Sequence, residues 1–231
     1  MSLLNKSQKR PKEIAILNFP SGHKIEVCHN IRGVHEGKAD GLIIEGLWGF
    51  NDLGSIFGRH LGLDRKRIEP LFIANQQSDD ITVSSFLYAG TDSTLKAIAF
   101  VPTENSRCYQ KLATSFYGRP YRDFYYNTVY EALGLLTGFG CADVAIAGLT
   151  GSERHSADIE LGNCVAEAIA HFAIENKSLR SVLSVGYGGP NLSNGIKYFN
   201  EHPENIGRHR NIQSEITIEN DITSLSFVLP Q

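Results

Sequence analysis

The sequence predicts an α/β protein in which a central sheet carries helices on both faces, giving three α/β/α layers. Two observations support this prediction. Short apolar runs of strand length alternate with amphipathic helical stretches from residue 39 to residue 199, and several runs are apolar throughout, as in strands buried on both faces. No Pro/Ser-rich linker interrupts the alternation, so we expect one domain rather than two.

The expected strands are apolar runs bounded by turn residues. Residues 13–19 and 24–28 flank a Pro20-Ser21-Gly22 turn and are expected to pair as a hairpin. Residues 39–44 and 142–147 are compact buried runs, each followed within two residues by a glycine. The remaining expected strands are residues 68–74, 81–88, 95–101, 179–185, 212–218 and 224–229.

Four stretches have apolar residues at helical spacing. The first begins at a cap near Asn51 or Asp52 and runs to about residue 62. The longest, residues 119–138, has an apolar stripe, and a glycine at its end can supply the C-terminal cap. The other two expected helices are residues 159–174 and 192–199.

Composition and charge narrow the class of protein. Hydrophobic residues make up 42% and charged residues 20%, which argues against a disordered, collagenous or coiled-coil chain. With 22 Lys and Arg against 25 Asp and Glu, the net charge is −3, so no global field steers the chain onto nucleic acid. Nucleic acid and membrane are therefore not expected partners, and a homo-oligomer is left open.

The chain ends and the cysteines predict its organisation and compartment. Residues 1–12 are polar and basic without the apolar segment of a secretory signal, and we expect them to form a flexible leader. Residues 13–231 are expected to form the single domain, with a C-terminal extension from about residue 203. No apolar stretch has membrane-spanning length, and the four cysteines are far apart without CxxC pairing. These features predict a cytoplasmic protein without structural zinc.

Two glycine-containing loops follow buried strands and lead into helices. The first loop, residues 45–54, contains Gly46, Gly49 and Gly54, and the second loop, residues 148–155, contains Gly148 and Gly151. In open α/β sheets ligands bind beyond the carboxyl ends of strands, where glycines let backbone N–H groups approach a phosphate. Neither loop matches GxxxxGK[ST] or GxGxxG, which argues against a common NTPase or dinucleotide-dehydrogenase site. The competing interpretation is that these glycines only form tight turns.

The order of segments resembles the macro domain family, the ADP-ribose-binding α/β/α fold with a mixed central sheet. The stretch "KIEVCHNIRGV…ADGLII" is similar to the family's opening strand, its Gly-Asp-Ile-Thr turn and its "VDAIVNAAN" strand. "ADVAIAGLTG" is similar to the strand and loop that wrap the diphosphate, and "SVLSVGYGGPNLSNGIKYFNE" to a late strand and helix. The resemblance runs from about residue 24 to residue 199 and implies a cleft for ADP-ribose or a related phosphorylated nucleotide.

The resemblance implies one ligand contact after the expected strand 24–28 and others in the second loop. Asn30, next to Ile31, stands where the family has an Asp that hydrogen-bonds the adenine amino group, and an amide oxygen can still accept that bond. The diphosphate would meet Gly148, Thr150 and Gly151, with Ser152 beginning a polar run that the family pattern lacks.

The first loop departs furthest from the family pattern. Ile44 and Leu47 align with the family's two Asn positions, and neither side chain can orient a ribose or a water. Trp48 and Phe50 either stack on a base or ribose or fill the cleft. These departures favour binding over catalysis.

Three residues are candidates for acid or base chemistry, each with a simpler structural role. Glu45 and Asp52 flank the first loop, and a carboxylate pair there could activate a water; Asp52 is also suited to cap a helix. His155 in the second loop could act as acid or base near neutral pH, or be solvated. No His, Cys, Asp and Glu cluster has metal-site spacing, so neither a metal nor a cofactor is expected.

Residues 116–126 form a dense run of aromatic and arginine side chains. Interleaved Arg and Tyr can stack on nucleic-acid bases. Tyr121, Phe124 and Tyr125, however, fall on one helical face, which favours core packing or a dimer surface.

The sequence therefore predicts a binder of ADP-ribose or a related phosphorylated nucleotide, with hydrolysis of an ADP-ribosyl or phosphoester bond if it is an enzyme. The alternative is a degenerate macro-fold module that makes structural or protein contacts without binding nucleotide.

Overall fold

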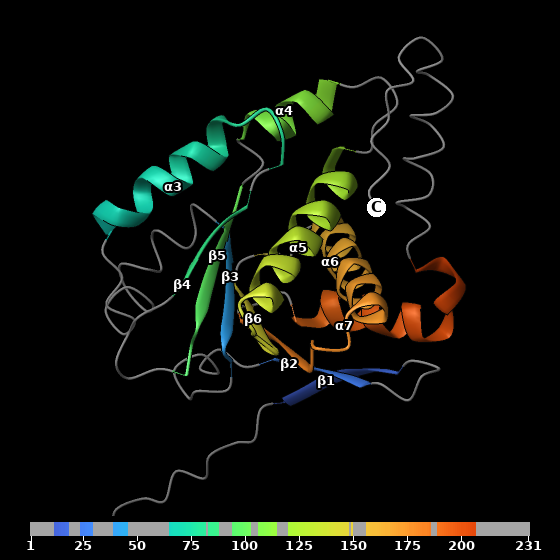
Figure 1. The fold of residues 1–231 in the computed structure, drawn as a ribbon. Helices are drawn as coiled ribbons and strands as arrows, with labels where there is room; N and C mark the ends of the chain where they lie inside the picture. Colours follow the sequence, from blue (N-terminus) through green and yellow to red (C-terminus); the bar gives the residue numbers. More distant parts are fainter. Residues whose placement is uncertain are drawn as a thin grey trace, which may run out of the picture.

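Seven strands form one sheet at the centre of the protein (Figure 1). The structure is a computed structural model, and it describes residues 12–18, 24–29, 39–45, 65–81, 83–87, 94–102, 106–114, 120–147, 149, 156–185 and 189–206. The strands are β1 (Lys12–Asn18), β2 (Lys24–His29), β3 (Gly41–Glu45), β4 (Ser84–Leu87), β5 (Ala97–Val101), β6 (Asp143–Ala147) and β7 (Ser181–Val185).

The sheet is mixed. Its order is β1-β2-β7-β6-β3-β5-β4, with the five central strands parallel and β1 and β4 antiparallel at the two edges. The antiparallel pairing of β1 with β2 confirms the predicted hairpin. Parallel neighbours need crossover connections, and the helices between the strands provide them.

Five α-helices belong to the described part of the chain. They are α3 (Arg65–Gln77), α4 (Arg107–Thr114), α5 (Pro120–Gly138), α6 (Ser156–Glu175) and α7 (Gly189–Glu201), and a short 3₁₀ helix, η2 (Pro203–Asn205), follows α7. None of the described helices combines the length and apolar character needed to cross a bilayer.

Alternation along the strands divides the core into two faces. Ile43 and Ile146 belong to the buried cluster that contains residues of α5, α6 and α7. Their neighbours Ile44 and Phe100, which pair in register, point to the other face and are also buried. Helix α3 lies on that second face, because its Asn75 bonds to β4 and β5 there. The predicted three α/β/α layers are therefore present, with the sheet between α3 and the α5–α6 pair (Figure 1).

Helix α3 corrects one prediction, because residues 68–74 were expected to form a strand. Leu71 and Ile73 are 37% and 45% exposed, so this apolar run is not a buried strand. Asn75, in the same helix, is fully buried. Its Nδ2 donates to the carbonyl of Phe100 at 2.9 Å, and its Oδ1 accepts from Ser84 Oγ at 2.6 Å. Tertiary hydrogen bonds at a polar residue hold α3 on the sheet.

The other predicted elements have mixed outcomes. The strands expected at 81–88, 95–101, 142–147 and 179–185 and the helices expected at 119–138, 159–174 and 192–199 are confirmed with shifted ends. Helix α4 was not predicted; Ser106 caps it by accepting from the Tyr109 N–H at 3.3 Å. The expected helix near residues 51–62 and the expected strands at 212–218 and 224–229 lie outside the described residues.

Three cysteines behave as small buried hydrophobes. Cys108, Cys141 and Cys164 are not in disulfides with other described residues, and they are buried in the core cluster. Burial, with the charge of Asp40 nearby, raises the pKa of the Cys141 thiol to about 11. Cys141 is therefore a packing residue rather than a reactive thiolate.

Asp40 ties together the amino ends of the parallel strands. Its Oδ1 accepts the backbone N–H groups of Ala142 and Asp143 at 2.9 and 2.8 Å. Its Oδ2 pairs with Lys96 Nζ at 2.9 Å, and the same ammonium donates to the carbonyl of Gly140 at 2.9 Å. The side chain thus links the starts of β3, β5 and β6.

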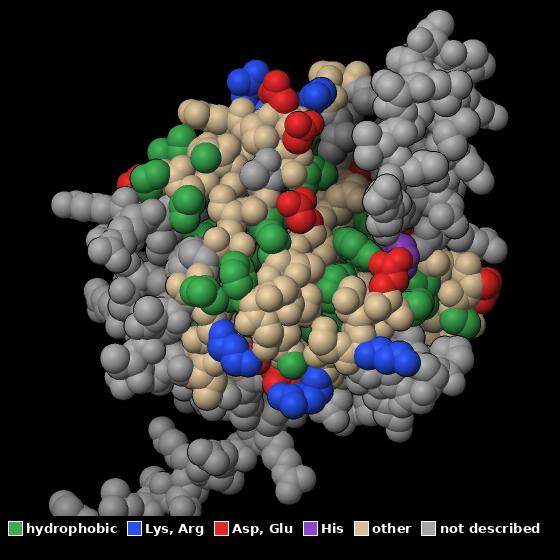
Figure 2. All heavy atoms as spheres, viewed as in Figure 1, with side chains coloured by type: hydrophobic (Ala, Val, Ile, Leu, Met, Phe, Trp, Pro, Cys, Tyr) green, Lys and Arg blue, Asp and Glu red, His purple; other side chains and the backbone are tan. Residues whose placement is uncertain are grey.

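Asp143 extends this network to β7. It accepts from Arg180 Nε at 2.9 Å and from Ser181 Oγ at 2.7 Å, and it also pairs with the Arg180 Nη2. Partial burial acts to raise the pKa of Asp143, but the hydrogen bonds from Arg180 and Ser181 and the charges of Arg180 and Lys96 outweigh it and hold the pKa below its ordinary value. Figure 2 shows Lys and Arg side chains at the lower margin of this face of the molecule and again at its top.

Helices α6 and α7 pack at a close crossing. A Cβ added to the buried Gly195 would lie 2.6 Å from the Cβ of Ala166, 3.1 Å from Oδ1 of Asn163 and 3.1 Å from the carbonyl oxygen of Gly162. The first distance is too short for two carbon atoms, so only glycine fits at residue 195 without movement of one helix.

Gly195→Ala is expected to lower the free energy of unfolding by roughly 1–3 kcal/mol, because the added methyl group overlaps Ala166. Urea unfolding measures the change. Adding Ala166→Gly should recover part of the loss. Gly134→Ala is the matched control, because its Cβ would meet only Phe172 Cε2 at 3.8 Å; it should leave stability unchanged or raise it by up to about 1 kcal/mol. Wild-type stability in Gly195→Ala would show that the helices are not this close.

Asp143→Asn is expected to cost about 1 kcal/mol at pH 7, a modest value because the Arg180 side chain is 73% exposed. The folded-state pKa of Asp143 is depressed, so its contribution is present above the unfolded pKa of about 3.9 and is lost as pH falls through the folded pKa. The stability difference between wild type and Asp143→Asn should therefore shrink below about pH 4.

Urea unfolding of both proteins from pH 7 to pH 2.5 tests this. Asp79→Asn is the control, since Asp79 pairs with Arg107 at 3.1 Å but both side chains are more than half exposed. Its effect should be small at every pH. An Asp143→Asn difference that stays constant down to pH 2.5 would contradict the assignment.

Candidate functional site at the carboxyl edge of the sheet

Four neighbouring parallel strands end together at one edge of the sheet. In sheet order they are β2, β7, β6 and β3. The register aligns His29 with Ser184, Ala147 with Val185, and Ile44 with Ala147, so the four strand ends lie within about one residue of one another. We call this side of the sheet the carboxyl edge.

The residues predicted to bind ligand follow three of these four ends directly. Asn30 and Ile31 come after β2, Gly46 after β3 and Gly148 after β6. Since β3 and β6 are hydrogen-bonded neighbours, the first and second loops begin side by side. Strand order depends on pairing between segments far apart in the chain, so the adjacency of β3 and β6 is a finding of the structure.

Of the predicted site residues, Glu45 is described, as the last residue of β3 and the partner of Val101 in β5. The others lie outside the described residues. They are Asn30, Ile31, Gly46, Trp48, Gly49, Asp52, Gly54, Gly148, Thr150, Gly151, Ser152 and His155.

Three helices begin at the carboxyl edge. The last residues of α5 lead to Cys141, whose Sγ donates to the carbonyl of Asp40 at the amino edge, so α5 runs from the carboxyl edge to the amino edge. Helices α6 and α7 also follow strands that end at the carboxyl edge and begin there. The positive ends of the helix dipoles therefore point toward this edge, which favours an anionic ligand.

Two features of this edge were not predicted from the sequence. Residues 186–188, with glycines at both ends, follow β7 in the chain, and the last residue of β7, Val185, pairs with Ala147 at the end of β6. Asp123 lies in the first turn of α5 and is 5% exposed, which places a buried carboxylate near the same edge. A Gly-rich stretch after an apolar run was the available signal for residues 186–188; no signal in the sequence marked Asp123 as buried.

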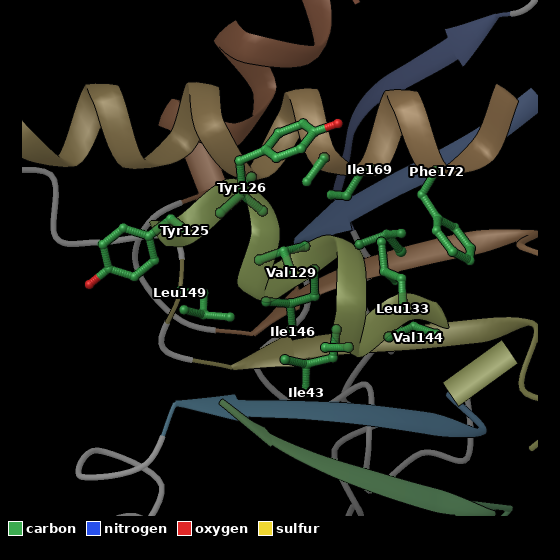
Figure 3. Close-up of a cluster of buried hydrophobic side chains, with 14 of the residues drawn as sticks. Ile43, Tyr125, Tyr126, Val129, Leu133, Val144, Ile146, Leu149, Ile169 and Phe172 are labelled. Atoms are coloured by element: carbon green, nitrogen blue, oxygen red, sulfur yellow. The ribbon is translucent and has the colours of Figure 1, made fainter. Parts of the chain in front are cut away.

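Leu149 is the described residue of the second loop. It is fully buried and belongs to the same cluster as Tyr125, Val129 and Ile146 (Figure 3). The loop therefore turns its second residue into the core directly after β6. The sequence signal was available, because Leu149 is apolar in an otherwise polar and glycine-containing stretch from residue 148 to residue 156.

The aromatic run of α5 is part of the core. Phe124 and Tyr125 are at most 2% exposed, and Phe124 packs edge-to-face against Tyr109 at 5.1 Å. Tyr126 is also buried. Of the two favoured interpretations, core packing or a dimer surface, core packing is confirmed for Phe124, Tyr125 and Tyr126, and these side chains are not accessible as a platform for nucleic-acid bases.

A polar cluster joins α5 to α6 within the helical layer. The hydroxyl of Tyr126 bonds to Nδ1 of His171, the hydroxyl of Tyr130 donates to Glu175, and His171 Nε2 lies 3.5 Å from Glu175 Oε1. These contacts satisfy the polar atoms of tyrosines that pack between two helices. Across the described residues, no three or more His, Cys, Asp or Glu side chains are grouped to hold a metal ion.

Solved structures provide the comparison for this architecture. The fold is similar to the Oceanobacillus iheyensis macrodomain with MES bound, with a TM-score of 0.53, 13% identity, and coverage of 81% of this chain and 97% of that chain. The same macrodomain with ADP gives a TM-score of 0.52 and 14% identity, with 81% and 97% coverage. No protein-family model matches the sequence, and no curated protein sequence is significantly similar to it.

Proposed function

Because this chain has the macrodomain fold, we propose that it binds ADP-ribose or a related phosphorylated nucleotide at the carboxyl edge of the sheet. The observation that carries the proposal is the pairing of β3 with β6, which starts the two glycine-containing loops side by side. A solved macrodomain of the same fold is described with ADP. An anionic diphosphate matches the helix N-termini at this edge and the adjacent ends of β3 and β6.

The diphosphate would lie over the two loops. Gly46, Gly49 and Gly54 in the first loop, and Gly148 and Gly151 in the second, carry no side chain that keeps a phosphate from the backbone N–H groups. Thr150 and Ser152 add hydroxyl donors. The N-termini of α6 and α7 at this edge favour the negative charge.

The adenine end would lie beyond β2 and β7. Asn30 follows the last residue of β2, which pairs with β7 next to the start of residues 186–188. Its amide oxygen would accept a hydrogen bond from the adenine amino group. Trp48 in the first loop would stack on a base or ribose.

We place binding ahead of catalysis. Ile44, which aligns with an Asn of the family pattern, is 1% exposed and points into the buried face of the sheet opposite Ile43, so it offers nothing to a ribose or a water. If hydrolysis of an ADP-ribosyl or phosphoester bond occurs, Glu45, Asp52 and His155 are the candidates to activate water. The free, buried thiols of Cys108, Cys141 and Cys164 support a reducing, cytoplasmic location.

Titration with ADP-ribose is expected to change the fluorescence of Trp48, the single tryptophan of the chain, and to raise the melting temperature. A ligand at 100 times its Kd adds about 2.7 kcal/mol of stability. ADP and AMP are titrated in parallel. The difference in affinity between ADP-ribose and ADP measures the contribution of the distal ribose, and the difference between ADP and AMP measures that of the second phosphate. Flat fluorescence and an unchanged melting temperature at millimolar concentrations of all three would exclude nucleotide binding and favour a structural or protein-interaction module.

Gly151→Leu is expected to weaken ADP-ribose binding by more than tenfold, because a side chain there occupies the space of the phosphate. Isothermal titration calorimetry measures the affinity. Gly138→Leu is the control: Gly138 ends α5 away from the carboxyl edge, and a Cβ there meets nothing within 4 Å. Wild-type affinity in Gly151→Leu would remove the second loop from the site.

A further inference from the structure

The two edge strands of the described sheet, β1 and β4, differ in their protection against pairing with another chain. Strand β1 begins with the charged residues Lys12 and Glu13, and its register with β2 is irregular between Glu13 and Ala15. Charges and an irregular register on an edge strand both hinder the addition of a further strand. The outer side of β1 is therefore protected in two ways.

Strand β4 has neither form of protection. Residues 81–88 contain no charged residue and no proline, and the register of β4 with β5 runs without a break from Ser84 to Leu87. Within the described part of the chain, β4 pairs with β5 alone. A strand that is paired on one side directs every second backbone N–H and C=O group to the other side. Strand β4 therefore offers a regular, uncharged set of backbone donors and acceptors.

Helices on both faces of the sheet hold β4 in place. On one face, Ser84 Oγ donates to Oδ1 of Asn75 in α3 at 2.6 Å. On the other face, the carboxylate of Glu131 in α5 accepts a hydrogen bond from the backbone N–H of Val83, next to the start of β4. The strand is thus ordered before a partner arrives, which lowers the entropy cost of pairing.

Exposed apolar side chains lie on and beside β4. Leu87 is 65% exposed, more than any other large hydrophobic residue in the described ranges. Leu71 and Ile73 are also exposed, on the helix α3 that packs on β4 and β5. Figure 2 shows hydrophobic side chains at the surface over α3. A partner that pairs with β4 covers apolar surface as well as backbone groups.

We propose that β4 pairs antiparallel with β4 of a second copy of this chain, which forms a symmetric dimer with one continuous sheet. A two-fold axis makes an edge strand complementary to itself. The dimer covers both β4 strands and leaves a protected β1 strand at each end of the joined sheet, so assembly stops at two copies. Because β4 has four residues, the new ladder is short, and we expect a Kd in the micromolar range. The dimer does not depend on nucleotide binding.

Analytical ultracentrifugation of the wild type, from low micromolar to several hundred micromolar protein, should show a monomer–dimer equilibrium. Leu87→Lys should raise the dimer Kd at least about tenfold, because the two-fold axis brings both added charges to the same short ladder. Ile174→Lys is the matched control: Ile174 is 49% exposed but lies in α6, so its dimer Kd should stay within about twofold of the wild type.

Melting temperatures at low protein concentration show whether each variant is folded. Leu87 is 65% exposed, so the lysine is solvated in the monomer and the melting temperature should not change. If Leu87→Lys does not fold, Leu87→Gln replaces it, with a smaller increase in Kd in the same direction.

Hydrogen exchange of the peptide covering residues 83–87 separates strand pairing from association through another surface. Protection of this peptide should rise with protein concentration in the wild type and in Ile174→Lys, but not in Leu87→Lys. Three results would overturn the proposal: a wild type that stays monomeric at the highest concentration, an open series of larger oligomers, or a dimer whose Kd and exchange are unaffected by Leu87→Lys.

Discussion

The parallel pairing of β6 with β3 on one side and β7 on the other is the constraint on which the rest of the structure depends. The register places Ile44, Ala147 and Val185 in one row across the sheet. The three strands therefore end at the same edge of the sheet, within about one residue of one another. The two predicted glycine-containing loops therefore follow strand ends that lie side by side, although about 100 residues separate these ends in the chain.

The two edges of the sheet have different roles. At the amino edge, Asp40 accepts the backbone N–H groups of Ala142 and Asp143 and pairs with Lys96, while Asp143 pairs with Arg180. These bonds join the starts of β3, β5, β6 and β7. At the carboxyl edge the strands end in loops and helix N-termini. A network that fixes the strand starts also fixes where the strands end, so the amino edge stabilises the frame on which the candidate site is built.

The core limits what the fold can do at the candidate site. Ile44 is 1% exposed, so its side chain belongs to the core and not to the surface of the carboxyl edge. Leu149 commits part of the second loop to the core. The same edge keeps its glycines and its helix N-termini, which recognise charge rather than perform chemistry. These features agree with the proposal that binding comes ahead of catalysis.

The sequence by itself determined the elements whose own periodicity is strong. The β1–β2 hairpin, strand β6 and helices α5 and α6 follow from apolar spacing and turn residues, because these patterns act within a few residues of the chain. Segment 68–74 was assigned to a strand from its apolar run, yet it forms part of α3 because the buried amide of Asn75 bonds to Ser84 and Phe100. Only the tertiary structure decided the hydrogen bonds of Asn75, the order of the strands, the adjacency of the ends of β3 and β6, and the burial of Leu149. Each depends on residues far apart in the chain that come together only when the sheet forms.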